Sequence, residues 1–195
     1  MNILIVLCHP DENSFTYQVY RKFTQGLINA GHNIILSDLY KQNFKTDLSK
    51  EEYLRETNYY AEQPLAKDVQ IEQSKIQNSD AIVLIYPVFW TEAPAKLVGW
   101  FDRVWTSGFA YNPHPQMKTL EKALIIACAG KSIQTLTETG ERAAMETVML
   151  GDHIRNRAKE KEMVILDDMT NWNKELRAKK LPIHLQNVYQ LGIDF

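Results

Sequence analysis

The chain has 195 residues, of which 45% are hydrophobic, so it can bury one good core, and we expect a single domain over residues 1–195. Its formal net charge of −2 argues against a nucleic-acid or membrane-surface binder, which would need clustered Lys and Arg. No apolar run approaches the roughly 18 residues of a membrane-spanning helix, and the N-terminus begins directly with a strand pattern, so we expect a cytoplasmic protein without membrane insertion.

Strand and helix patterns alternate along the chain. The strands are expected at residues 2–8, 33–36, 80–85, 123–128 and 163–166. Helical patterns cover residues 13–30, the residues from 93 onward, and 141–161. Strands that alternate with helices indicate βαβ units, and right-handed crossovers then place helices on both faces of a parallel sheet. The sequence therefore predicts an α/β fold of the doubly wound type.

The segment 43–77 interrupts this alternation. It is charged and rich in tyrosine, with Tyr53, Tyr59 and Tyr60, and it is too long for a simple connection in a compact domain. We expect it to contain helix and to cover an interface or a pocket.

The two cysteines, Cys8 and Cys128, stand at or beside the ends of apolar runs. They lack CxxC spacing and an evident histidine partner, so buried, reduced thiols are the better interpretation. We assign no metal ligands.

The junction between the first strand and the first helix carries polar groups. His9, Asn13, Ser14 and Thr16 lie around the start of the helix, where free N–H groups and the positive end of the helix dipole favour a phosphate. The junction lacks the glycines of a Rossmann or Walker loop. A second interpretation remains open, in which Asn13 or Ser14 is a simple N-cap and His9 is a surface residue.

The stretch 80–111 combines a buried strand, an aromatic loop and an amphipathic helix. Phe89 and Trp90 follow the carboxyl end of the strand, where open α/β sheets place their ligands. They can form the wall of a planar cofactor, or they can pack in a core or a dimer interface. Helical spacing predicts the buried face of the following helix, which consists of Leu97, Trp100, Phe101 and Val104.

Three motifs together resemble a known family. They are HPDENSFT after the first strand, GHNIILSDLYKQNF through the second, and YPVFWTEAPAKLVGWFDRVWTSGFAY after the third. The chain resembles the flavodoxin-like NAD(P)H:quinone oxidoreductases. These include the NAD(P)H dehydrogenase (quinone) enzymes and small flavoproteins that are ancillary subunits of glutathione-gated potassium efflux systems. The resemblance implies a flavodoxin-like doubly wound sandwich with a five-stranded parallel sheet.

The resemblance also implies where a flavin would bind. The loop after the first strand would hold the phosphate, the loop after the third would lie along the isoalloxazine, and the loop after the fourth would approach its pyrimidine edge. The corresponding residues are His9, Ser14, Phe15 and Thr16 in the first loop, Pro87, Val88, Phe89 and Trp90 in the second, and Ala127, Cys128, Ala129 and Gly130 in the third.

The implied activity is two-electron reduction of a quinone or a similar acceptor by NADH or NADPH, through a tightly bound FMN or FAD and a ping-pong mechanism. One alternative is a regulatory flavoprotein bound to a potassium efflux transporter, which would share nearly all of these motifs. Another is an electron-carrier flavodoxin, which typically has a strongly acidic surface that the charge of −2 disfavours.

One stretch departs from the resemblance. Well-known members carry a tyrosine and a histidine after the loop that follows the fourth strand, and residues 131–140 contain neither. We therefore assign no catalytic side chain. The negative charge of a reduced flavin is expected to rest on the backbone donors of Ala129 and Gly130. Two roles stay open for Lys131: it assists these donors, or it is a solvated loop residue.

A homodimer is common among such proteins. The helix bearing Trp100, Phe101 and Trp105 is expected to contribute to its interface, with Trp105 as an ordinary core residue as the alternative.

Overall fold

The computed structural model describes residues 1–195 and contains one five-stranded sheet whose strands are all parallel. The strand order is β2-β1-β3-β4-β5. The strands are β1 (Asn2–Leu7), β2 (Asn33–Asp38), β3 (Ala81–Pro87), β4 (Leu120–Cys128) and β5 (Ala158–Leu166). This confirms the predicted α/β fold with a five-stranded parallel sheet.

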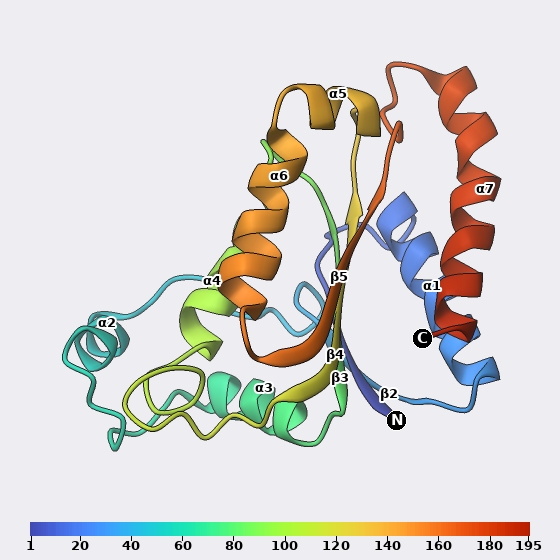
Figure 1. The fold of residues 1–195 in the computed structure, drawn as a ribbon. Helices are drawn as coiled ribbons and strands as arrows, with labels where there is room; N and C mark the ends of the chain where they lie inside the picture. Colours follow the sequence, from blue (N-terminus) through green and yellow to red (C-terminus); the bar gives the residue numbers. More distant parts are fainter.

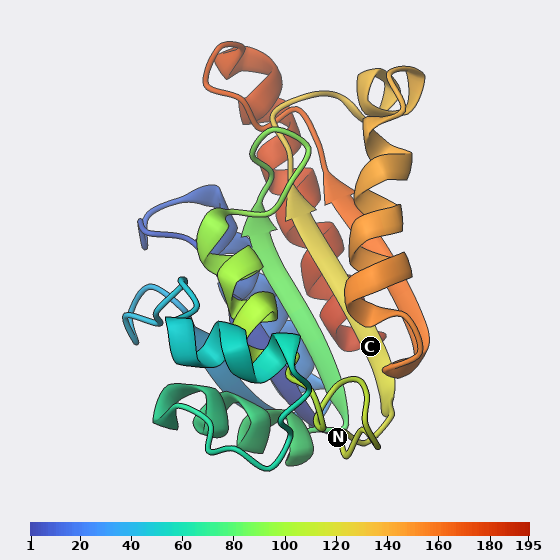
Figure 2. The same ribbon diagram turned by 90° about the vertical axis from the view of Figure 1, so that its left-hand side faces the viewer.

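Helices cover both faces of the sheet (Figures 1 and 2). On one face lie α1 and α7, and on the other lie α4, α6 and the π-helix η1, with α2 and α3 beside them. The helices are α1 (Phe15–Asn29), α2 (Lys50–Thr57), α3 (Lys67–Gln77), α4 (Ala95–Val104), α5 (Ile133–Glu138), α6 (Glu141–Glu146), η1 (Thr147–Ile154) and α7 (Lys174–Ile193). None of them combines the length and apolar character needed to cross a bilayer.

The core forms two layers, one on each side of the sheet. Alternate residues of β1 and β3 point to opposite faces, so Leu4 joins the α4 side and Ile5 joins the α1 side. The predicted buried stripe of α1 and the predicted buried face of α4 are both confirmed. Their members are Phe15, Val19, Phe23 and Leu27 on α1, and Leu97, Trp100, Phe101 and Val104 on α4.

Trp100, Phe101 and Trp105 are all buried within the chain and pack in its core. The homodimer expected from the resemblance stays a prediction. Trp105 is a core residue whose indole N–H donates to the carbonyl of His153 at 2.7 Å. The His153 ring in turn stacks on Phe101 with 3.9 Å between ring centroids.

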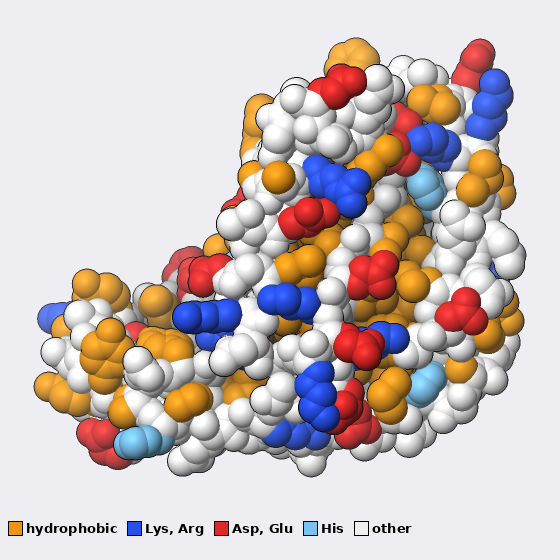
Figure 3. Space-filling model, in the orientation of Figure 1, with side chains coloured by type: hydrophobic (Ala, Val, Ile, Leu, Met, Phe, Trp, Pro, Cys, Tyr) orange, Lys and Arg blue, Asp and Glu red, His pale blue; other side chains and the backbone are white.

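The last strand begins earlier than predicted. Residues 155–161 were expected to continue a helix, but η1 ends at Ile154 and β5 starts at Ala158. Residues 159–162 of β5 are all charged and exposed. The strand lies at the edge of the sheet, where charges discourage pairing with another chain. Figure 3 shows basic and acidic side chains interspersed across the face of the molecule that is turned to the viewer. Because residues 159–162 are charged, the start of β5 does not show the apolar pattern by which the other strands were predicted.

The segment 43–77 contains two helices, as expected. A capping box begins α2, since the Ser49 hydroxyl accepts from the Glu52 amide while the Glu52 carboxylate accepts from the Ser49 amide. The C-terminal helix α7 was not predicted, and Pro182 lies within it.

Glycines allow α1 and α7 to approach closely. A Cβ on Gly26 would lie 2.3 Å from the carbonyl oxygen of Tyr189, and a Cβ on Gly192 would lie 2.4 Å from the carbonyl oxygen of Phe23. Both contacts are with backbone, which cannot move aside without separating the helices.

We therefore predict that Gly26→Ala lowers the free energy of unfolding by about 3 kcal/mol, because the added methyl group forces the helices apart. Gly151→Ala is the matched control, since a Cβ there meets nothing nearer than Thr147 Cγ2 at 4.0 Å. The control should gain about 0.5 to 1 kcal/mol from reduced backbone entropy. Urea denaturation measures both, and equal effects would contradict the close-packing account.

Candidate functional site

A cleft of about 460 Å³ opens at the carboxyl edge of the sheet. Figure 2 shows the loop after β3, α5 and the loop before α7 standing above the upper ends of the strands. Ligands in open α/β sheets bind at this edge. The cleft is lined by Val88, Trp90, Thr91, Ala129, Gly130, Lys131, Leu136, Glu141, Thr170 and Trp172.

The loop after β3 is a tight and strained turn. Phe89 and Glu92 exchange two backbone hydrogen bonds, of 2.9 and 2.8 Å, which leaves only Trp90 and Thr91 in the turn. Both have positive φ, 51° and 66°, in the left-handed region that disfavours side chains and β-branched ones above all. Trp90 is 100% exposed and Phe89 is 52% exposed. Their side chains therefore contribute little to the core, and the turn holds the indole out beside the cleft.

The loop after β4 presents a glycine and free amides. Gly130 has no positive φ, and a Cβ there would meet only Thr170, at 3.6 Å and beyond. Neither packing nor backbone conformation requires glycine at this position. The amides of Gly130 and Lys131 donate no hydrogen bond within the chain. The missing side chain and the unpaired donors together leave room for a flat polar edge to approach the backbone.

One predicted donor is not available. The amide of Ala129 donates to the carbonyl of Leu166 at 2.8 Å, so the expectation that it stabilises charge on a ligand is wrong. Parallel pairing with β5 continues one residue past the end of β4 and uses this amide. The hydrogen bond between Ala129 and Leu166 could not be predicted from the sequence. The two residues are 37 positions apart, and only the strand order of the sheet brings β4 beside β5.

The loop after β5 is fastened to the loop after β4. The Met169 amide donates to the Ala129 carbonyl at 3.0 Å, and the Asp168 amide donates to the Lys131 carbonyl at 3.2 Å. Beneath this contact, the carboxylate of Asp167 accepts from the Ile133 amide and from Lys180 Nζ. Burial alone would raise the pKa of Asp167, but these hydrogen bonds hold it below its usual value.

The loop after β1 forms a compact turn at the start of α1. His9 Nδ1 accepts from the Asp11 amide at 2.9 Å, which leaves the proton of the neutral ring on Nε2 as a free donor. Burial lowers the pKa of His9 and favours that neutral form. Ser14 is the N-cap, and its hydroxyl accepts from the Tyr17 amide at 3.2 Å. The amides of Phe15 and Thr16 have no partner within the chain.

This turn and the cleft lie at the same edge of the sheet. Strands β1 and β3 are direct neighbours, and β4 follows β3. The loops after β1 and β4 are therefore about two strand spacings apart, roughly 10 Å. A ligand with a phosphate at one end and a flat ring at the other can reach both loops.

Several predicted site residues support the edge from below. Pro87, Ala127 and Cys128 belong to the strands, and the Thr16 hydroxyl faces the Cys128 thiol. Cys8 and Cys128 are buried and form no disulfide, which confirms the prediction for both thiols. Burial raises the pKa of each to about 12.

Of the predicted residues, the structure places Val88, Trp90, Ala129 and Gly130 in the lining of the cleft. His9, Ser14, Phe15 and Thr16 lie outside it, in the loop after β1 and the first turn of α1. Sequence analysis missed Glu141, Thr170 and Trp172. Glu141 pairs with Lys131 Nζ at 2.6 Å, and the Lys131 side chain is still 56% exposed. An isolated tryptophan in the polar string Asn171-Trp172-Asn173 was the one available signal for the third loop.

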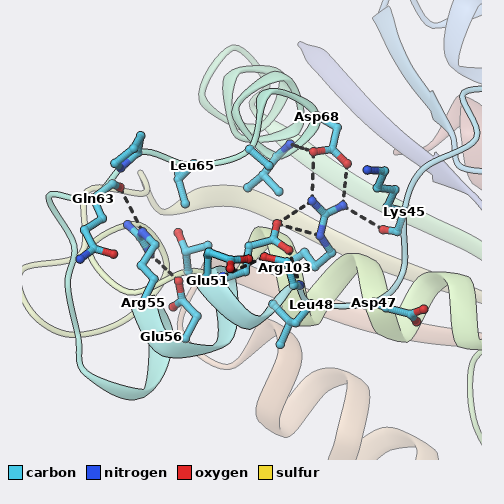
Figure 4. Close-up of a pocket in the computed structure, with 16 residues that line it drawn as sticks. Lys45, Asp47, Leu48, Glu51, Arg55, Glu56, Gln63, Leu65, Asp68 and Arg103 are labelled. Atoms are coloured by element: carbon cyan, nitrogen blue, oxygen red, sulfur yellow. Dashed lines mark hydrogen bonds and ion pairs between the residues drawn. The ribbon is translucent and has the colours of Figure 1, made fainter.

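A second and larger hollow, of about 730 Å³, lies between α2, α3 and α4 (Figure 4). Arg103 is 3% exposed and binds Glu52 at 2.6 Å, Asp68 at 2.5 Å and the Lys45 carbonyl at 3.0 Å. Arg55 is held in the same way by Glu56 and by backbone carbonyls. Because these ion pairs are internally satisfied and fasten segment 43–77 to the body of the protein, we interpret this hollow as structural despite its volume.

The fold and the edge site define the class of protein. A family model described as a flavodoxin-like fold matches residues 1–154. The chain therefore belongs to the flavodoxin-like family, as its motifs predicted.

Several proteins similar to this chain carry names that describe an activity. A solved NAD(P)H:quinone oxidoreductase from Methanothermobacter marburgensis is 39% identical, has a TM-score of 0.93, and the match covers 100% of this chain and 95% of that one. An uncharacterized NAD(P)H oxidoreductase from Haemophilus influenzae is 38% identical over 57% of this chain and 54% of its own. NAD(P)H dehydrogenase [quinone] 1 from Rattus norvegicus is 34% identical over 55% of this chain and 44% of its own. The chain spans about half the length of the curated relatives that it matches.

We predict that His9→Ala weakens flavin binding by about 1 kcal/mol, or roughly fivefold in dissociation constant, because one neutral donor to the phosphate is lost. His32→Ala is the control, since His32 lies at the opposite edge of the sheet, just before β2. Titration of flavin fluorescence measures both variants. Equal affinities for His9→Ala, His32→Ala and the unaltered protein would remove His9 from the site.

Proposed function

We propose that this protein is a flavin-dependent NAD(P)H:quinone oxidoreductase, in which residues 1–195 act as one flavin-binding domain. The observation behind this proposal is the cleft at the carboxyl edge of the sheet. It is lined by the exposed Trp90, by Gly130, where neither packing nor φ requires glycine, and by the unpaired amides of Gly130 and Lys131. The 39% identity to an NAD(P)H:quinone oxidoreductase along the whole chain supports it. The relatives named above are oxidoreductases, which favours an enzyme over a transporter subunit.

The residues present fit a flavin. The free amides of Phe15 and Thr16 and the positive end of α1 suit a phosphate. Val88 and Trp90 provide an apolar border for a flat ring, and Gly130 leaves space where a Cβ would intrude. Both FMN and FAD share the ring and the first phosphate, so these contacts support either cofactor.

When bound, the flavin would supply two-electron transfer from NADH or NADPH to a quinone or similar acceptor. The protein's own part is to position and to stabilise charge. The unpaired amides of Gly130 and Lys131 would stabilise negative charge at the ring edge, and the Lys131 ammonium, which pairs with Glu141, would add to this effect. The overall reaction, NAD(P)H + H⁺ + quinone → NAD(P)⁺ + hydroquinone, consumes one proton, which solvent water would supply in this open cleft, so we assign no side chain as its donor. The nicotinamide and the acceptor would use the cleft in turn.

We also propose that the protein acts as a homodimer through the outer face of α2. Large apolar side chains are exposed there and on the following turn, and Figure 3 shows the corresponding lobe at the left with apolar atoms on its surface. The residues are Tyr53, Leu54, Tyr59 and Tyr60. Tyrosine is enriched where protein interfaces are well packed. The ion pairs of Arg103 hold this lobe rigid, which reduces the entropy cost of association.

Sedimentation of the protein tests this surface. We predict a dimer for the unaltered chain and a monomer for Tyr59→Glu with Leu54→Glu, because buried carboxylates without partners are costly at an interface. Ile183→Glu is the control, since Ile183 is similarly exposed but lies on α7. A dimer that survives the double substitution would place the interface elsewhere.

Steady-state kinetics test the proposed activity. We predict that the protein purifies yellow, or becomes yellow with FMN or FAD, and that it oxidises NAD(P)H with menadione. Double-reciprocal plots should give parallel lines, because the oxidised nicotinamide leaves before the quinone enters the same cleft. Intersecting lines would contradict a shared site. A protein that binds neither flavin would overturn the proposed function altogether.

A further inference from the structure

A cluster of charged and polar side chains lies where α7 meets the loops after β4 and β5. Its members are Asp167, Asp168, Lys180 and His184. Asp167 is 6% exposed and His184 is 9% exposed, so the cluster buries charge at a cost in solvation. None of the four side chains lines the cleft of about 460 Å³. Any effect of the cluster on the cleft must therefore pass through the backbone that the cluster holds.

Lys180 is the centre of the cluster. Its Nζ lies 2.8 and 2.9 Å from the two carboxylate oxygens of Asp167, and 2.6 Å from Oδ2 of Asp168. Burial alone would lower the pKa of Lys180, but the two carboxylates raise it above its usual value. One ammonium group therefore holds together two consecutive carboxylates that would otherwise repel each other.

The cluster holds the loop after β4 through two hydrogen bonds to its backbone. The Asp167 carboxylate accepts from the Ile133 amide at 2.9 Å, and the Asp168 amide donates to the Lys131 carbonyl at 3.2 Å. The backbone of residues 131–133 is therefore fixed on the side that faces the loop after β5.

A third hydrogen bond sets the direction of the Gly130 amide. The Met169 amide donates to the Ala129 carbonyl at 3.0 Å. The peptide between Ala129 and Gly130 is trans, so the Gly130 N–H points opposite to that carbonyl, away from the loop after β5 and toward the side of β3. Val88, which lines the cleft, follows β3 on that side.

Asp168 adopts a conformation that needs support. Its φ is 58°, in the left-handed region, which is costly for a residue with a side chain. In this conformation its amide reaches the Lys131 carbonyl while its carboxylate reaches Lys180. The ion pair offsets part of the cost, so removing the ammonium would weaken the hold of Asp168 on the Lys131 carbonyl.

Stability alone does not explain this arrangement. A buried ion pair adds little net stability, because the loss of solvation offsets much of the attraction between the charges. Charged hydrogen bonds of fixed geometry do orient the groups that they join, and functional sites depend on such support from behind. Here the supported group is the loop that carries Gly130 and Lys131.

We propose that Lys180 is a positioning residue of the flavin site. Through Asp167 and Asp168 it holds the loop that presents the Gly130 and Lys131 amides, and it thereby raises the reduction potential of the bound flavin without lining the cleft. Donors at the ring edge favour the reduced flavin, which carries negative charge, over the neutral oxidised form. This inference rests on the proposed function and adds a residue outside the cleft that tunes the cofactor.

The first test measures the midpoint potential of the flavin-loaded protein in Lys180→Met, Lys180→Arg and Lys179→Met. Lys179 is the matched control, because it is exposed on the same helix and forms no ion pair. We expect Lys180→Met to weaken binding of reduced flavin about tenfold more than binding of oxidised flavin, the effect of one hydrogen bond to a charged group. That ratio equals a fall of about 30 mV in the two-electron potential. The other two variants should keep the potential of the unaltered protein, since Lys180→Arg retains a cation for both carboxylates.

Asp168→Asn separates positioning from a direct effect of charge. Asparagine tolerates a left-handed φ but gives Lys180 no carboxylate. Removal of a negative charge would by itself raise the potential of a nearby flavin, whereas a weaker hold on the Lys131 carbonyl lowers it. We expect a fall. A raised or unchanged potential in Asp168→Asn would overturn the inference, and so would equal potentials in Lys180→Met and Lys179→Met.

Hydrogen exchange in the protein without flavin gives a readout that does not depend on the cofactor. The Ile133 and Asp168 amides should exchange about tenfold faster in Lys180→Met than in Lys179→Met, while the amides of β3 keep their rates. Equal rates for the two loop amides would overturn the inference, and so would faster exchange throughout the sheet, which would make Lys180 a residue of global stability. Failure of the unaltered protein to bind flavin is a different result, since it would defeat the proposed function itself.

Discussion

The candidate site depends on backbone hydrogen bonds that continue beyond the ends of β3, β4 and β5 and hold the loops after these strands together. The Val88 amide donates to the Cys128 carbonyl, the Ala129 amide to the Leu166 carbonyl, and the Met169 amide to the Ala129 carbonyl. Because the strands are parallel, these bonds hold three consecutive loops side by side at one edge. The residues that line the cleft come from loops of separate strands. These hydrogen bonds keep the loops at a constant distance from one another.

The two hollows of the molecule differ in whether their polar groups have hydrogen-bond partners. The larger one in Figure 4 is lined by buried arginines whose donors are occupied by carboxylates and carbonyls, so nothing in it calls for a ligand. The smaller cleft keeps amides without partners, a glycine that packing does not need and a strained turn. Unpaired polar groups and strain cost stability, and they are tolerated where binding can offset them. Polar groups without hydrogen-bond partners therefore identify the binding site better than the volume of the cavity does.

The sequence was sufficient for the architecture and for part of the site. Apolar runs located β1, β3 and β4, because strands buried on both faces must be apolar along their whole length. The charged start of β5 was assigned to a helix, since an edge strand lacks that pattern. The sequence left two roles open for Trp105 and misassigned the Ala129 amide, because their partners, His153 and Leu166, are distant along the chain. Trp172 was missed for the same reason: only the sheet order brings the loop after β5 beside the loop after β4.

We propose that the carboxyl edge of the sheet binds the isoalloxazine ring and the phosphate of a flavin. A crystal structure of the protein saturated with whichever of FMN and FAD binds more tightly tests this directly. We expect ring density beside Val88, Trp90 and Gly130, with a phosphate within hydrogen-bonding distance of the Phe15 and Thr16 amides. Flavin density in the hollow beside Arg103, or a ring at the carboxyl edge with its phosphate away from the start of α1, would contradict it.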